Sequence, residues 1–73
     1  MIEHLEKRFG TLAVEKGFIT KDQLVESMKV QLERDLAGMD HSLIGSILYS
    51  LGYITISQIS DVLESMGVPI RGF

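Results

Sequence analysis

Residues 16–24 read KGFITKDQL, and 35 positions later residues 51–59 read LGYITISQI. Both stretches place a glycine, an aromatic residue, an isoleucine, a threonine and a glutamine in the same order. A glycine followed by two apolar residues and then by Thr-x-x-Gln is typical of one helix ending and the next beginning. The two stretches therefore predict two tightly connected helix pairs.

Each matched position has a role in ending or starting a helix. Gly17 fits the left-handed conformation that ends a helix, which glycine adopts at little cost. Thr20 and Gln23 form a capping box, in which each side chain binds an unpaired backbone N–H group at the start of the next helix. The same three residue types recur at Gly52, Thr55 and Gln58. The fold signal is therefore equally strong in both halves.

The similarity extends over residues 8–31 and 43–66, and a repeat of this period marks one supersecondary unit used twice. The identical pairs are Gly10/Gly45, Gly17/Gly52, Ile19/Ile54, Thr20/Thr55 and Gln23/Gln58. We expect one all-α domain over residues 1–73, built from two helix–Gly–helix hairpins and a short extended C-terminal tail. The predicted helices span about residues 2–16, 20–37, 41–51 and 55–66.

The second and third predicted helices are bounded by further signals. Apolar residues recur at four-residue steps in the second helix. They are Leu24, Met28, Leu32 and Leu36. Gly38 is the expected stop of this helix, and Asp40 or Ser42 the expected start of the third.

Composition limits the classes of protein that fit. The chain has 73 residues, 45% of them hydrophobic, no cysteine and a net charge of −3. The absence of cysteine excludes disulfides and thiolate metal sites, so packing, alone or with a partner, must hold the core. An acidic N-terminus without a long apolar run predicts neither a signal peptide nor a membrane-spanning helix, and favours the cytoplasm.

The residues that carry chemistry are few and scattered. His4 and His41 have no second histidine or carboxylate cluster at metal-ligand spacing, so we expect no metal site, no cofactor and no catalytic residues. The acidic residues lie mainly on polar sides of the predicted helices. No basic patch is visible, so we expect no nucleic-acid partner.

Three residues have both a structural and a functional interpretation. Gly10 lies inside a predicted helix, where glycine costs about 1 kcal/mol against alanine, so either a neighbouring helix or a ligand approaches closely there. Arg8 is either a surface residue or a group that stacks on a base or binds a phosphate. Gln31 is either a ligand contact or a residue at the edge of an apolar stripe.

Residues 8–24, RFGTLAVEKGFITKDQL, followed by Gln31, resemble a repeated motif of the N-terminal domain of type II secretion and type IV pilus assembly ATPases. These are the GspE N-terminal and MshEN-type domains. The resemblance covers Arg8 to Pro69 and excludes the ATPase domain. It implies either docking onto an assembly partner or binding of the second messenger cyclic di-GMP.

The resemblance also assigns candidate nucleotide-binding residues: Arg8, Phe9, Gly10, Gln31 and Gly45. The second copy departs from the family pattern, with Leu43 in place of the arginine and Met66 in place of the glutamine. Half of the polar contacts of the family's ligand site are therefore missing.

We therefore expect a small non-catalytic protein-interaction or adaptor module, with a partner from a secretion, pilus or signalling assembly. The alternative is a cyclic di-GMP sensor with a degenerate second motif. A homodimer is compatible with both functions. The candidate binding residues are Val14, Tyr49, Tyr53 and the tail around Phe73.

Overall fold

A computed structural model describes residues 4–40 and 42–67 of the chain. The described residues form four helices and no strand. They are α1 (His4–Glu15), α2 (Lys21–Leu36), α3 (Ile44–Ser50) and α4 (Ile56–Ser65). The all-α class is thus confirmed, and the predicted tail at 68–73 lies outside the described residues. In this part of the chain no helix is both long and apolar enough to cross a membrane.

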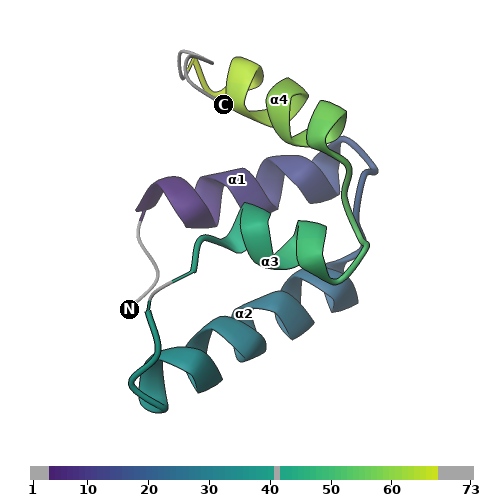
Figure 1. Ribbon diagram of the computed structural model, residues 1–73. Coiled ribbons are helices and arrows are strands. Elements are labelled where there is room, and N and C mark those ends of the chain that lie inside the picture. The colour runs from purple at the N-terminus through teal and green to yellow at the C-terminus, as the bar shows by residue number, and fades with distance from the viewer. Residues whose placement is uncertain (1–3, 41, 68–73) are drawn as a thin grey trace.

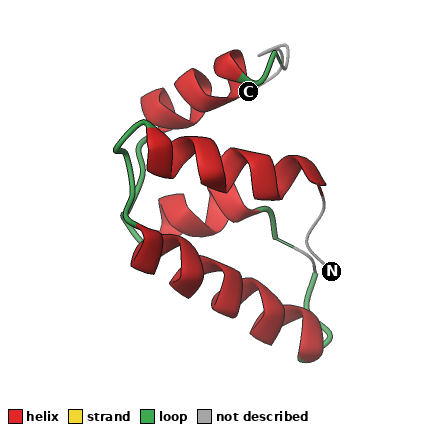
Figure 2. Ribbon diagram, turned by 180° about the vertical axis from the view of Figure 1, so that it is seen from behind, coloured by secondary structure: helices red, strands yellow, loops and turns green. Residues whose placement is uncertain are grey.

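The four helices pack around α1 and α3. Figure 1 shows α3 between α1 and α2, and α4 on the other side of α1. Figure 2, the view from behind, shows the same order, with α2 and α4 on opposite sides of the molecule. α1 contacts each of the other three helices. One side of α2 therefore faces α1 and α3, whereas none of the other described helices packs against its opposite side.

The two tight turns have the same backbone geometry. Gly17 and Gly52 have φ angles of 77° and 81°, in the left-handed region. The N–H of Phe18 donates to the Ala13 carbonyl over 3.0 Å. In the second turn the N–H of Tyr53 donates to the Leu48 carbonyl over 2.9 Å. These bonds define the glycine-terminated helix end that the sequence predicts.

The helices that follow both turns begin with a complete capping box. The Oγ1 atom of Thr55 accepts from the Gln58 N–H over 3.1 Å, and Gln58 Oε1 accepts from the Thr55 N–H over 3.0 Å. Thr20 and Gln23 make the same two bonds, over 3.1 and 2.9 Å. The reciprocal pairs satisfy N–H groups that would otherwise lack a partner at a helix start.

Removal of the threonine cap at the start of α4 is expected to lower the free energy of unfolding of the domain. Replacement of Thr55 by alanine removes the acceptor at the start of α4 and should lower the free energy of unfolding by about 1 kcal/mol. Urea denaturation followed by circular dichroism measures the change. Thr11→Ala is the control, because the Thr11 hydroxyl donates to the Lys7 carbonyl within α1, an exposed bond whose loss should leave the stability almost unchanged. Equal losses for both variants would contradict the assigned role of the cap.

The third helix begins later than the sequence predicts. The expected start lay near residue 41 with Asp40 or Ser42 as cap, whereas α3 starts at Ile44 and its N-cap is Leu43, without a side-chain cap. Ser42 is instead engaged by α2. Its carbonyl accepts from Gln31 Nε2 over 2.7 Å, and its Oγ accepts from Arg34 Nη1 over 3.5 Å. Long-range bonds to α2 thus hold the residue that local chemistry suggested as a cap.

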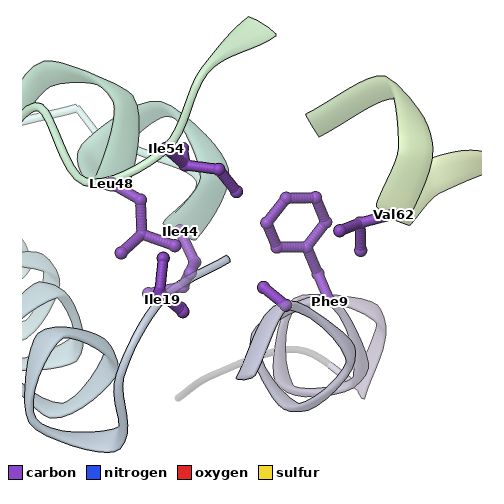
Figure 3. Close-up of a cluster of buried hydrophobic side chains, with 7 residues drawn as sticks. Phe9, Ile19, Ile44, Leu48, Ile54 and Val62 are labelled. Carbon is purple, nitrogen blue, oxygen red and sulfur yellow. The ribbon is translucent and has the colours of Figure 1, made fainter. Parts of the chain in front are cut away.

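A small cluster of apolar side chains forms the core (Figure 3). Its most buried members come from α1, α3, α4 and the two turns. They are Phe9, Ala13, Ile19, Ile44, Leu48, Ile54 and Val62. Figure 3 shows the Phe9 ring reaching from its helix toward Val62 and Ile54. Phe9 therefore joins the two halves of the repeat.

Candidate functional site

Arg8 lies on the solvent side of α1 and is exposed. A shallow hollow runs along this side of the helix. It is lined by Lys7, Arg8, Thr11, Leu12 and Glu15. Two cationic side chains and one carboxylate thus border the hollow, and the equivalent residue of the second repeat, Leu43, is also exposed. The opening position of the motif faces solvent in both copies.

Phe9, the neighbour of Arg8, has the opposite environment. Its side chain is only 6% exposed and belongs to the apolar core. Its ring also lies against Gly45, because a Cβ atom placed on Gly45 would be 3.3 Å from Phe9 Cζ. A ligand could reach Phe9 only by displacing core side chains. The structure therefore explains Phe9 by packing.

The two matched glycines permit close contacts between helices. A Cβ atom on Gly10 would lie 2.6 Å from Cδ1 of Leu24, so the side chain of α2 occupies the space above the α1 backbone. Gly45 leaves the corresponding space for Phe9. Of the two explanations that the sequence left open, close approach of a helix therefore accounts for both glycines.

Gln31 is buried in α2, with 2% of its surface exposed. Its amide nitrogen donates to the Ser42 carbonyl and so fastens the segment before α3 to α2. Ser27, one turn earlier on the same side of α2, is fully buried and donates from its hydroxyl to the Leu24 carbonyl over 2.7 Å. The equivalent positions of the second copy are the apolar Val62 and Met66. The glutamine that closes the motif, Gln31, thus holds the segment before α3 against α2.

The outer part of the predicted stripe on α2 is exposed, contrary to the pattern that suggested a buried side. Leu32 and Leu36 are 56% and 79% exposed, whereas Leu24 and Met28 are partly buried and pack against the core. Each four-residue step turns about 40° beyond a full helical turn, so Leu36 is rotated by about 120° from Leu24. The drift of a strict four-residue spacing is the sequence signal that predicts this exposure.

A second set of residues shares that exposed side. Val25 is 59% exposed, and Lys29 is exposed between it and Leu32. Positions 25, 29, 32 and 36 fall within about 60° of one another around the helix. We call Val25, Lys29, Leu32 and Leu36 the α2 face. These side chains are exposed, and α2 lies at the edge of the described helices (Figures 1 and 2).

The surface residues suggested by the sequence have mixed environments. Tyr49 is 51% exposed. Val14 is partly buried and packs against the core, and Phe73 lies outside the described residues. Tyr53 is partly buried, and its hydroxyl donates to Glu26 Oε1 over 2.8 Å. This hydrogen bond, with smaller contributions from desolvation and from the negative charge of Glu26, raises the pKa of the Tyr53 phenol above its usual value.

The five residues assigned by resemblance therefore do not form one exposed site. Arg8 faces solvent, Phe9, Gly10 and Gln31 are buried, and Gly45 is half-buried. The described residues include no group of three or more histidine, cysteine, aspartate or glutamate side chains that could hold a metal ion. Comparisons with models of protein families, with curated proteins and with solved structures found no match for this chain.

Proposed function

We propose that this chain is a small non-catalytic protein-interaction module that binds a partner through the α2 face. The observation that carries the proposal is the exposure of Val25, Leu32 and Leu36 on one side of a single helix, each by more than half. Isolated apolar side chains are common on protein surfaces, but an aligned set is typical of interaction sites. A helix presenting such a set can pack against an amphipathic helix of another molecule.

Two further exposed apolar residues follow α2. Met39 and Leu43 are each 59% exposed. Large exposed apolar side chains thus continue along the chain past α2, and contiguous exposed apolar patches are often functional. The exposure of Met39 has a local cause. At the Gly17 and Gly52 turns the N–H of the residue after the glycine bonds the carbonyl of an apolar residue, whereas the Met39 N–H bonds the carbonyl of Arg34. The apolar contact that often accompanies such a helix end therefore has no apolar partner at Met39.

The resemblance to the N-terminal domains of secretion and pilus assembly ATPases gives this module a proposed setting. Members of that family dock a cytoplasmic motor onto an assembly partner. We therefore propose an adaptor role near a secretion, pilus or signalling assembly. The residues of the shared motif would then maintain the fold, and the exposed α2 face would make the contact.

Affinity purification from lysate of the source organism tests the use of the α2 face. We expect the double variant Leu32→Gln/Leu36→Gln to lose proteins that the wild type retains, as quantified by mass spectrometry. The matched control is Ile56→Gln, which also replaces a large exposed apolar side chain but on α4. Identical sets of retained proteins for the wild type and the α2 variant would refute the proposal.

A second candidate function is binding of cyclic di-GMP along α1. The exposed guanidinium of Arg8 beside Lys7 on a shallow hollow favours it, because both groups are suited to phosphate. Calorimetric titration separates the two functions. Heat that Arg8→Ala removes would support a sensor, and no heat at high micromolar cyclic di-GMP would exclude the site.

A further inference from the structure

The α2 face has a spacing that is the same in both chain directions. Its residues lie at positions 25, 29, 32 and 36, so the steps are four, three and four. We propose that the occupant of this face is a second copy of the chain, with the two α2 helices antiparallel about a two-fold axis. The proposal rests on the proposed function, since it names the partner of the same surface.

The two-fold axis brings unlike residues of the face into contact. With the axis midway between positions 30 and 31, Val25 packs against the partner's Leu36, and Lys29 lies opposite the partner's Leu32. A two-fold interface repeats every such contact, so each pairing occurs twice. The methylene groups of Lys29 cover the apolar side chain opposite, while its ammonium group extends to the rim. The whole face is then used without an unmatched position.

Charged residues along one edge of the α2 face, which we call its rim, are placed to form ion pairs between two antiparallel copies. Glu33 is exposed and follows Leu32 directly, on the same side of the face as Lys29. In an antiparallel pair, equivalent rims meet, so Lys29 approaches the partner's Glu33. Neither Lys29 nor Glu33 has an ion-pair partner among the described residues of its own chain. Two equivalent ion pairs therefore form on association.

The area and the remaining charges set the expected strength. The face has four residues in each copy, against about 20–30 residues per partner in a standard interface, so we expect a dimer of about micromolar affinity that exchanges with monomer. Two other carboxylates lie on the same side of the face, Asp22 and Glu26. Glu26 is rotated about 20° beyond Glu33 around α2 and accepts the hydrogen bond from Tyr53, and Asp22 lies near the N-terminal end of α2, opposite residues of the second copy that follow its Leu36.

Sedimentation velocity on the full chain over a concentration series measures the association. We expect the wild type to shift from monomer to dimer with rising concentration and Leu32→Gln/Leu36→Gln to remain monomeric. Lys29→Glu and Glu33→Lys should each weaken the dimer about tenfold or more, because each places like charges together twice. Circular dichroism verifies that every variant is folded. Lys7→Glu and Glu64→Lys, on α1 and α4, change the net charge equally and should dimerise as the wild type does.

Mixing the two charge variants gives the sharpest outcome. In a mixed dimer the carboxylate introduced at position 29 meets the ammonium introduced at position 33, and the native pair forms on the other side. We therefore expect the equimolar mixture to recover wild-type association. A wild type that stays monomeric at high micromolar concentration, or a mixture no stronger than its components, overturns the inference. If the α2 double variant still loses a heterologous partner in affinity purification, the proposed function stands and only the second copy is rejected.

Discussion

Replacement of Phe9 by alanine is expected to lower the free energy of unfolding by about 3–5 kcal/mol. The Phe9 ring is 6% exposed and lies among side chains from α1, α3 and α4, so its removal leaves a cavity between both halves of the repeat. A domain of this size is stable by only about 4–11 kcal/mol. The variant should therefore unfold at a much lower urea concentration than the wild type.

Arg8→Ala is the matched control for this experiment. Arg8 is adjacent in sequence but exposed, so its replacement should change the free energy of unfolding by no more than about 0.5 kcal/mol. The pair separates a structural from a ligand-binding role for the motif. A Phe9→Ala variant with wild-type stability and lost affinity for cyclic di-GMP would contradict the assignment of Phe9 to the core.

Replacement of Gln31 by leucine is expected to cost about 1–3 kcal/mol of stability. Leucine has a similar volume, so the main change is the loss of the amide that donates to the Ser42 carbonyl over 2.7 Å. That carbonyl lies in a partly buried position, where an acceptor without a donor is unfavourable. Urea denaturation gives the magnitude, and hydrogen exchange in α3 shows whether the helix start loosens.

Ser42→Ala is the control for Gln31. It keeps the backbone carbonyl that Gln31 binds and removes only the hydroxyl, whose bond to Arg34 is 3.5 Å long. We expect a loss below about 0.5 kcal/mol. A larger loss for Ser42→Ala than for Gln31→Leu would show that the hydroxyl, not the glutamine amide, holds this segment.

The parts of the fold that depend on local chemistry were predictable from the sequence. Gly17 and Thr20 act through bonds to residues within a few positions, and both turns have the expected glycine conformation and capping box. The start of α3 was not predictable in this way. Ser42 is a good local cap, but bonds from Gln31 and Arg34 engage it, and these depend on how α2 packs.

The candidate site was even less predictable from local sequence than the start of α3. The motif identified Phe9, Gly10 and Gln31 as residues with a particular role, but a motif does not indicate which side of a helix becomes buried. In the folded chain Phe9, Gly10 and Gln31 are buried in the core or in contacts between helices. Arg8, which belongs to the same motif, faces solvent. The exposure of Leu32 and Leu36 could have been anticipated from the drift of their four-residue spacing.

The most direct test of the α2 face is a series of amide correlation spectra of the labelled chain recorded at increasing protein concentration. We expect resonances of Val25, Lys29, Leu32 and Leu36 to move with concentration, while those around Arg8 stay fixed. Leu32→Gln/Leu36→Gln should abolish the movement. Spectra that do not change with concentration, or changes confined to the residues around Arg8, would contradict the pairing of two copies through this face.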